Sequence, residues 1–202
     1  KGVTEINELT YTIMPDRIEA GTYLIAAALT EGKLKITGID PKIIETEIQT
    51  LKKTGAKITI RKNEINIKGN KIIKGVNIRT APYPGFPTDL AAQMMVLLCR
   101  ANKKSFIKEE IFENRFMHVN ELQRMGAKIL IKGNKAIIDG NTIFQSAEVM
   151  ATDLRASASL VLAALCSKGK SNISRLYHLR RGYENLENKL RKIGAKVKKI
   201  DV

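Results

Sequence analysis

The phrase LKKTGAKITI at residues 51–60 occurs again as LQRMGAKILI at 122–131 and as LRKIGAKVKKI at 190–200. The glycines of the three copies, Gly55, Gly126 and Gly194, are 71 and 68 residues apart. Each copy has the pattern of a helix that ends at a glycine, followed by a strand with alternating apolar residues. The spacing is too regular for chance and too long for a solenoid repeat, so it predicts three related folding units.

A second phrase precedes each copy and has nearly the same period. Asp16, Asp89 and Asp153 each open an apolar helix rich in alanine or leucine, and they are 73 and 64 residues apart. Aspartate is a common helix N-cap, so we expect all three to cap their helices. Together the two phrases predict strand, helix, strand, helix and two hairpin strands in each unit, with turns at 62–63 and 133–134.

The helices that begin at the three aspartates are apolar on most faces, whereas the helices before the glycines are charged. We therefore expect the apolar helices at the centre and the sheets outside them. The predicted fold class is α/β (α+β), an inside-out α/β barrel of three βαβαββ repeats around a pseudo-threefold axis with buried central helices. Residues 1–202 form one domain in this prediction, with repeats at about 10–70, 76–140 and 147–202.

The ends of the chain predict that it is part of a longer protein. Residue 1 is lysine rather than methionine, and the third repeat stops after AKVKKIDV without a hairpin partner for its last strand. We expect a distant segment of the full protein to supply that strand.

The composition limits the possible classes of function but does not identify one. The chain has 35 Lys and Arg against 20 Asp and Glu, a net charge of +15, which favours anionic partners but also fits lysines on solvated strand faces. No apolar run approaches the length of a membrane span, so we expect no membrane partner. Cys99 and Cys166 end apolar helical runs, where free cysteine acts as a small core residue. His118 and His178 are isolated, and no metal site is expected.

Four motifs are specific enough to indicate a family: TAPYPGFPTDL at 80–90, FENRFMHVNELQRMGA at 112–127, ATDLRASASLVLAAL at 151–165 and LYHLRRGYENLENKLRKIGA at 176–195. They resemble the UDP-N-acetylglucosamine enolpyruvyl transferases of the EPSP synthase-like superfamily. The resemblance runs from about Tyr11 to Val202 and corresponds to the C-terminal catalytic domain of a two-domain enzyme. The family fold is two domains of three βαβαββ units each.

The resemblance implies a transferase that moves the enolpyruvyl group of phosphoenolpyruvate to the 3-hydroxyl of UDP-N-acetylglucosamine and releases phosphate. That reaction is the first committed step of cytoplasmic peptidoglycan biosynthesis, on which cell-wall formation, cell shape and cell division depend. No cofactor is implied. The expected partners are the two substrates and the missing N-terminal domain. That domain carries the family's loop cysteine, the target of fosfomycin, so neither cysteine of this chain takes that role and the fragment is expected to be inactive alone.

Asp89 matches the family's catalytic aspartate in FPTD, and its other interpretation is a helix N-cap like Asp16 and Asp153. Arg155 and Arg181 match the arginines that bind phosphoenolpyruvate, since a planar guanidinium suits phosphate and carboxylate, and their other interpretation is a surface arginine. By resemblance, Thr88 and Asp89 contact UDP-N-acetylglucosamine. By the same resemblance Ile111, Phe112 and Arg115 belong to its pocket, and core packing explains these three equally well. Asp16 resembles a cleft residue but is equally explained as a cap.

Two other functions remain in competition. Enolpyruvylshikimate phosphate synthase performs the same transfer on a different hydroxyl, and the FENRFMH and ATDLRASASL runs argue against it. A basic nucleic-acid-binding module would explain the net charge of +15, but only 5% of the residues are aromatic and no stacking platform is evident.

Overall fold

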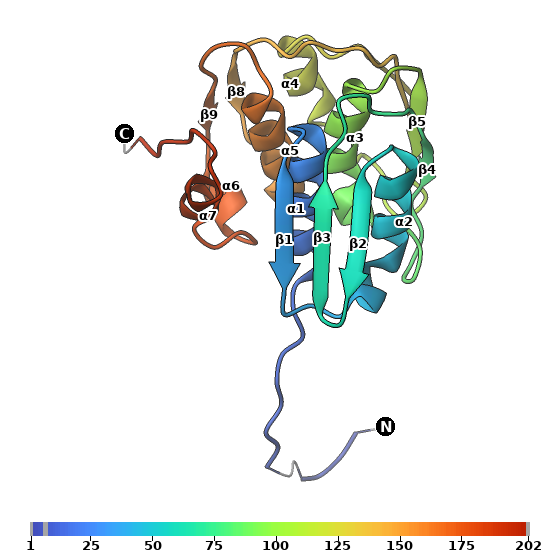
Figure 1. The fold of residues 1–202 in the computed structure, drawn as a ribbon, viewed down its shortest axis with the longest axis vertical. Helices are drawn as coiled ribbons and strands as arrows, with labels where there is room; N and C mark the ends of the chain where they lie inside the picture. The colour runs from blue at the N-terminus through green and yellow to red at the C-terminus, as the bar shows by residue number, and fades with distance from the viewer. Residues whose placement is uncertain (1, 6–7, 201–202) are drawn as a thin grey trace.

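The computed structural model describes residues 2–5 and 8–200 of the chain. Three helices lie at the centre and the strands lie around them (Figure 1). The central helices are α1 (Arg17–Leu29), α3 (Ala91–Cys99) and α5 (Leu154–Leu165), and they pack against one another in pairs. Every residue of α3 is buried. A helix that is apolar all round has no face for water, so the core forms around it.

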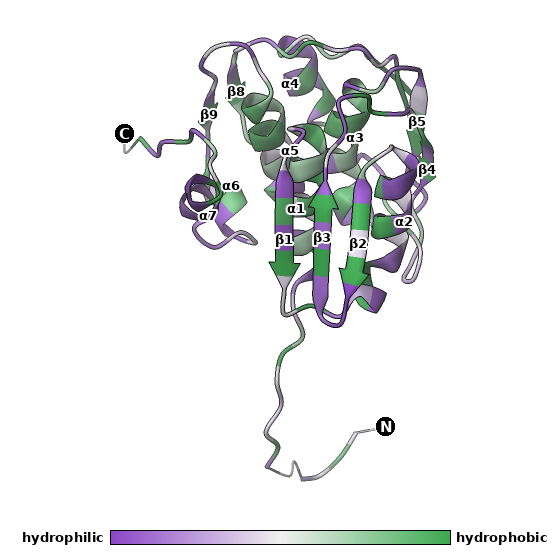
Figure 2. Cartoon of the chain, viewed as in Figure 1, coloured by the Kyte–Doolittle hydropathy of each residue, from purple (hydrophilic) through white to green (hydrophobic). Residues whose placement is uncertain are grey.

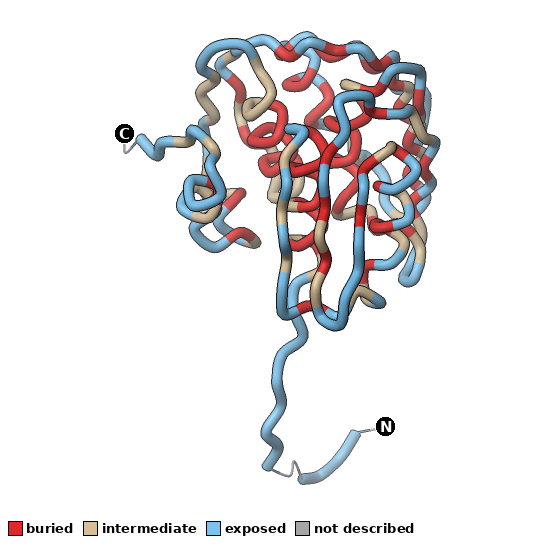
Figure 3. The backbone as a smooth tube through the Cα atoms, viewed as in Figure 1, coloured by how far each residue is buried: buried red, intermediate tan, exposed pale blue. Residues whose placement is uncertain are grey.

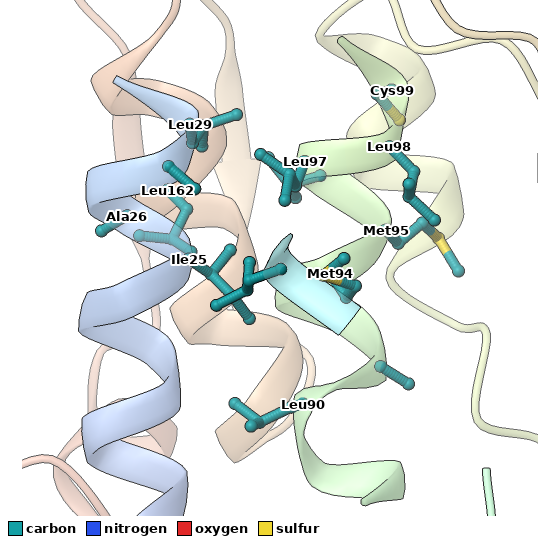
Figure 4. Packing of buried hydrophobic residues seen from close by; sticks show 14 of the residues in the cluster. Ile25, Ala26, Leu29, Leu90, Met94, Met95, Leu97, Leu98, Cys99 and Leu162 are labelled. Carbon is teal, nitrogen blue, oxygen red and sulfur yellow. The ribbon is translucent and has the colours of Figure 1, made fainter. Parts of the chain in front are cut away.

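The core is closed by side chains from all three central helices. Leu29 of α1, Leu97 of α3 and Leu162 of α5 point toward one another, and each is at most 2% exposed (Figure 4). A second, smaller cluster packs the outer face of α5 against the C-terminal helices α6 (Tyr177–Arg180) and α7 (Leu186–Lys192). The C-terminal segment is therefore attached to the core mainly through α5.

Three separate sheets surround the helices. In the first, β1 (Lys33–Thr37) and β2 (Lys57–Arg61) both pair antiparallel with β3 (Glu64–Lys68). The second has the order β4 (Asn77–Arg79), β5 (Ser105–Lys108), β7 (Lys135–Ile138), β6 (Ile129–Lys132), and only β4 and β5 are parallel. The third pairs β8 (Glu148–Met150) with β9 (Asn172–Ser174) in parallel.

Alternating side chains decide which face of each strand meets the helices. Ile65 and Ile67 of β3 are buried while the residues between and beside them are not. Figure 2 shows the same alternation of hydrophilic and hydrophobic residues along β1 and β3. This period of two places one face of the sheet on the core and the other in water.

The repeated glycines end three helices in the same way, as predicted. Gly55, Gly126 and Gly194 follow α2 (Glu45–Lys53), α4 (Val119–Arg124) and α7 with φ of 101°, 95° and 99°. In each case the glycine N–H and the next alanine N–H bond carbonyls of the last helical turn, at 2.9–3.3 Å. This is the Schellman arrangement, and a residue with a Cβ would be strained at the glycine. The predicted hairpin turns are also present, with positive φ at Asn63 and Gly133.

The predicted βαβαββ order is complete only in the middle unit, which reads β4, α3, β5, α4, β6, β7. The first unit reads α1, β1, a short 3-10 turn (Pro41–Ile44), α2, β2, β3, because residues 8–16 form no strand. Tyr11, Ile13 and Met14 are 57–85% exposed there, in a segment that extends away from the body (Figure 3). The strand predicted ahead of α1 is therefore wrong for this structure.

The third unit also departs from the prediction. It reads β8, α5, β9, α6, α7, and residues 195–200, expected to form an alternating strand, have no strand structure. A strand needs a neighbour to pair its backbone N–H and C=O groups, and none of the described residues offers one here. The three sheets of the described residues stay separate and do not close into a barrel.

Two further features bear on function. Within residues 2–5 and 8–200, no helix is long and apolar enough to cross a bilayer. A cavity of about 1080 Å³ lies between α1, α5, α7 and the chain after Gly194. It is separate from the segment that carries Asp89, since none of its lining residues comes from residues 80–120.

Candidate active site

The approach to α3 is a proline-rich loop at residues 82–87 that the first unit holds in place. Thr46 of α2 donates its hydroxyl to the Pro84 carbonyl at 2.5 Å, and the Arg17 guanidinium lies 5.2 Å from the centre of the Tyr83 ring. Arg17 is itself fixed by a 2.8 Å ion pair with the buried carboxylate of Glu47. Burial raises the pKa of Glu47 and the Arg17 guanidinium opposes that shift. The loop therefore presents the residues that follow it, Thr88 and Asp89, in a defined position.

Asp89 does not cap α3, which corrects the prediction that all three aspartates are N-caps. It lies within a 3-10 turn (Thr88–Leu90), and no side chain bonds the first N–H groups of α3. Its carboxylate is held by two arginines instead: Arg115 Nη2 donates to Oδ1 at 2.7 Å, and Arg155 Nη2 donates to Oδ2 at 3.1 Å. The Asp89 side chain is 36% exposed, so it remains open to a ligand.

Asp16 and Asp153 do cap their helices. The Asp16 carboxylate accepts the N–H groups of Ile18 and Glu19 at 2.7 and 3.2 Å. The Asp153 carboxylate accepts those of Arg155 and Ala156 at 2.8 and 2.9 Å. Within the part of the chain that the structure describes, Asp16 makes no hydrogen bond or ion pair with Arg115 or Arg155, so its geometry is explained by capping.

A buried acid that sequence reasoning missed organises the loop after β5. Glu109 is 2% exposed, and its carboxylate accepts the hydroxyls of Thr80 and Thr88 at 2.9 and 2.7 Å. The same carboxylate accepts the backbone N–H groups of Ile111 and Phe112 at 2.9 and 3.2 Å. One side chain thus links the Asp89 turn to the FENRF loop. The only signal in the sequence was an acidic pair after an apolar strand, which is common on protein surfaces.

The FENRF loop delivers Arg115 to Asp89. Arg115 reaches Thr88 Oγ1 through Nε at 3.4 Å, and its guanidinium lies 5.1 Å from the centre of the Phe112 ring. Phe112 is 56% exposed and Ile111 is half-buried. With Arg155, which also bonds Asp89, the structure therefore brings five of the predicted residues together: Thr88, Asp89, Phe112, Arg115 and Arg155.

Arg155 lies in the first turn of α5, and Tyr183 lies behind it. The guanidinium is 6.0 Å from the centre of the Tyr183 ring, within the range of a cation–π contact. The Tyr183 hydroxyl shares a hydrogen bond of 2.8 Å with Thr22 Oγ1 and accepts Gln93 Nε2 at 3.1 Å. This buried network joins α1, α3 and the segment after α6, so the surface behind Arg155 is rigid. Its members were not predicted as site residues.

Arg181 is not brought into contact with this group. It is exposed at the end of α6, and its side chain forms no hydrogen bond or ion pair with the residues that the structure describes. The next residue, Gly182, packs so closely on Leu154 that an added Cβ would lie 2.9 Å from its Cδ2. The loop that carries Arg181 therefore passes beside the start of α5, where it contacts Leu154, the residue before Arg155.

The site can supply one carboxylate and at least two guanidinium groups. A carboxylate oxygen has two lone-pair positions, so Asp89 can accept a further hydrogen bond while both arginines hold it. Cys99 and Cys166 are free, and burial raises the pKa of Cys99 to about 12, which excludes it as a thiolate nucleophile near neutral pH. Among the described residues, no group of three or more His, Cys, Asp and Glu side chains could hold a metal ion.

Comparisons with known proteins agree on one family. The model of the family EPSP synthase (3-phosphoshikimate 1-carboxyvinyltransferase) matches residues 1–190. The chain is 72% identical over 201 residues to a UDP-N-acetylglucosamine 1-carboxyvinyltransferase of Pelagibacter ubique (strain HTCC1062), a match that covers 100% of this chain and 48% of that protein. It is 50% identical to the protein of the same description from Desulfosudis oleivorans, over 99% of this chain and 48% of that one. The chain thus spans about half the length of these relatives.

Solved structures share the fold. The enolpyruvyl transferase NikO from Streptomyces tendae superposes with a TM-score of 0.83 at 28% identity, over 92% of this chain and 44% of that one. An EPSP synthase from Acinetobacter baumannii superposes with a TM-score of 0.72 at 17% identity, over 94% of this chain and 44% of the other, which speaks for the fold alone.

Proposed function

The chain belongs to the EPSP synthase (3-phosphoshikimate 1-carboxyvinyltransferase) family, and from that premise we propose what its parent protein does. The parent transfers the enolpyruvyl group of phosphoenolpyruvate to the 3-hydroxyl of UDP-N-acetylglucosamine and releases phosphate. The observation that carries the proposal is the Asp89 carboxylate, which is held by two arginines instead of capping its helix. The arrangement supplies a proton acceptor and cationic groups in one place.

The choice of acceptor rests on the relatives. The family description names 3-phosphoshikimate, whereas proteins 72% and 50% identical over nearly the whole chain are described as UDP-N-acetylglucosamine 1-carboxyvinyltransferases. Identity at this level favours the amino-sugar nucleotide. Shikimate 3-phosphate is the second candidate, because its transfer uses the same donor chemistry.

Asp89 serves as the general base. As the sugar hydroxyl adds to C2 of phosphoenolpyruvate, the O–C2 bond forms, the hydroxyl proton passes to the base, and C3 gains a proton to become a methyl group. In the second half the C2–O bond to phosphate breaks and the methyl group loses a proton, which restores the double bond. A carboxylate placed beside the hydroxyl suits the first proton transfer.

Three arginines have the remaining roles. Arg155 binds the anionic donor at the N-terminal end of α5, where the helix dipole adds positive potential, and Arg181 joins it from the neighbouring loop. Arg115 orients Asp89 and the loop, while Thr88, Ile111 and Phe112 line the nucleotide-sugar side. Asp16, a cap in this chain, would reach the cleft only in the complete protein.

We propose that the chain is one domain, the C-terminal half of a two-domain enzyme, and that its three units have the complete βαβαββ order around a pseudo-threefold axis only in the parent protein. The repeated helix ends at Gly55, Gly126 and Gly194 support the three units. The cavity of about 1080 Å³ beside residues 195–200 supports a missing strand, because it lies where the third unit lacks its hairpin. We assign this cavity to a segment of the parent protein and not to a substrate. The N-terminal half and the two substrates are the expected partners.

The parent protein then acts in cytoplasmic peptidoglycan synthesis, without a cofactor and without nucleic acid or membrane partners. Phosphate release by the complete protein with phosphoenolpyruvate tests this: UDP-N-acetylglucosamine should support turnover and shikimate 3-phosphate should not. The reverse preference would reassign the acceptor, and turnover with neither would overturn the proposed function. The 202-residue chain alone should give no turnover, and robust turnover by it would show that the N-terminal half is not needed.

A further inference from the structure

Two buried polar atoms beside the Asp89 site have no hydrogen-bond partner among the described residues: Nη1 of Arg155 and Nε2 of His118. The Arg155 side chain is 19% exposed, but Nη1 itself is shielded from solvent. His118 is 2% exposed at the start of α4. A buried donor or acceptor without a partner is costly, so each atom calls for an explanation.

Both residues line the same small cavity. Its volume is about 20 Å³, and its other polar lining residues are Thr88, Arg115 and Asp153. A water molecule needs at least about 10–15 Å³ and two to four polar partners. The cavity is therefore large enough for one water molecule and too small for a phosphate or carboxylate group.

The chemistry of the two atoms is complementary. Burial lowers the pKa of His118 to about 4, so the imidazole is neutral near pH 7. The main chain of Arg115 opposes this shift of the pKa. In a neutral imidazole one ring nitrogen carries the proton and the other accepts, and a proton on Nδ1 leaves Nε2 as the acceptor. Arg155 Nη1 is a donor. One water molecule can accept from Nη1 and donate to Nε2.

We propose that His118 is a positioning residue that holds the Arg155 guanidinium through a single water molecule bound in this cavity. The guanidinium is then fixed on three sides: Nη2 bonds Asp89 at 3.1 Å, the Tyr183 ring lies 6.0 Å away, and the water binds Nη1. His118 lines this cavity together with Arg115 and Arg155, the two arginines that hold the Asp89 carboxylate. The consequence for catalysis rests on the proposed function, but the water site does not.

The first test is a high-resolution crystal structure of the complete protein without substrates. An ordered water about 2.7–3.2 Å from both Arg155 Nη1 and His118 Nε2 is expected. A direct bond between the two side chains, or a cavity with no water that contacts both, would overturn the proposal. This measurement needs no variant and no turnover.

The second test separates positioning from packing. His118→Gln keeps an acceptor near the position of Nε2, whereas His118→Met fills a similar volume without one. Both should lower the melting temperature by similar amounts. We expect His118→Met to lower kcat/KM for phosphoenolpyruvate about tenfold, as befits one hydrogen bond to a charged group, and His118→Gln to restore most of that loss. Equal losses in the two variants would mean that His118 acts through packing alone. Failure of the wild-type protein to turn over would count against the proposed function only.

Discussion

The start of α3 and the start of α5 share the sequence Thr-Asp-Leu, yet the two aspartates do different work. Asp153 caps α5 through two backbone N–H groups, whereas Asp89 leaves α3 uncapped and pairs with Arg115 and Arg155. One aspartate of the repeated phrase caps its helix, and the other pairs with arginine side chains. The repeat explains the position of both, and only the surroundings decide the role.

The two aspartates differ because a different residue follows the adjacent strand in each unit: Glu109 follows β5, and Arg175 follows β9. Pairing registers place Lys108 of β5 beside Arg79 and Ser174 of β9 beside Met150, so Glu109 and Arg175 are equivalent. Glu109 is buried and accepts the Thr88 hydroxyl, whereas Thr152 of the third unit has a buried hydroxyl without a described partner. In the middle unit Glu109 therefore holds Thr88 and fixes the 3-10 turn at Thr88–Leu90, from which the Asp89 side chain reaches the arginines.

The largest expected effect is on Asp89 itself. Asp89→Asn keeps the size of the side chain but removes the proton acceptor. In the complete protein we expect kcat to fall by about 10² to 10⁴, with only a modest change in affinity for UDP-N-acetylglucosamine. Steady-state phosphate release and acceptor titration measure the two quantities. An unchanged kcat would exclude Asp89 as the base.

The next largest effect is expected for Arg155, which bonds the Asp89 carboxylate. Arg155→Gln removes one guanidinium from Asp89 and from the donor site, so kcat/KM for phosphoenolpyruvate should fall by about 10- to 100-fold. Arg61→Gln, an exposed arginine on β2, serves as the control and should leave the same constant within twofold, about the scatter of a surface change. Similar losses in both variants would indicate a general effect of charge.

Glu109 tests what shapes the turn. Glu109→Gln cannot satisfy two hydroxyls and two backbone N–H groups with one carbonyl oxygen, so the free energy of unfolding should fall by about 1–3 kcal/mol. Urea denaturation measures it. Glu110→Gln is the matched control, because Glu110 is the next residue and makes surface ion pairs with Arg79 and Lys108. The urea midpoint of Glu110→Gln should be unchanged. A shift as large as that of Glu109→Gln would mean that Glu109 has no special role in stability.

The smallest effect is on stability, and it compares Asp153, which caps its helix, with Asp89, which does not. Asp153→Ala should lower the free energy of unfolding by about 1 kcal/mol, because two N–H groups of α5 lose their acceptor. Asp89→Ala should cost less, since Asp89 bonds no N–H group of α3. The two variants can be compared in one urea series. A loss at Asp89 as large as that at Asp153 would contradict the assignment of the cap.

Local sequence patterns predicted the features that depend on neighbouring residues in the chain, which are the helix ends and the buried helices. The helix ends at Gly55, Gly126 and Gly194 depend on a left-handed residue and are as predicted. The apolar helices α1, α3 and α5 lie at the centre because they have no polar face. The strands expected before α1 and after Gly194 do not form, because strand formation depends on a partner that a single segment cannot provide.

The site was predictable only in part. Resemblance identified Asp89, Arg115 and Arg155, and the structure brings these three into contact. Glu109 and His118 escaped notice because an acid after a strand and an isolated histidine carry no local signal. Their roles come from burial and from partners distant in sequence, such as Thr80 for Glu109 at 2.9 Å. The Thr-Asp-Leu phrase could not separate cap from base, since its local sequence is the same in both units.

Whether Asp89 is a base or a cap is decided by the ratio of kcat between two asparagine variants. Asp89→Asn and Asp153→Asn make the same chemical change at equivalent places in the repeat, and asparagine caps a helix about as well as aspartate. In the complete protein, Asp89→Asn should be slower by about two orders of magnitude or more, while the melting temperatures of the two variants stay close. Equal losses of kcat at both positions, with equal drops in melting temperature, would contradict the account and make Asp89 a cap.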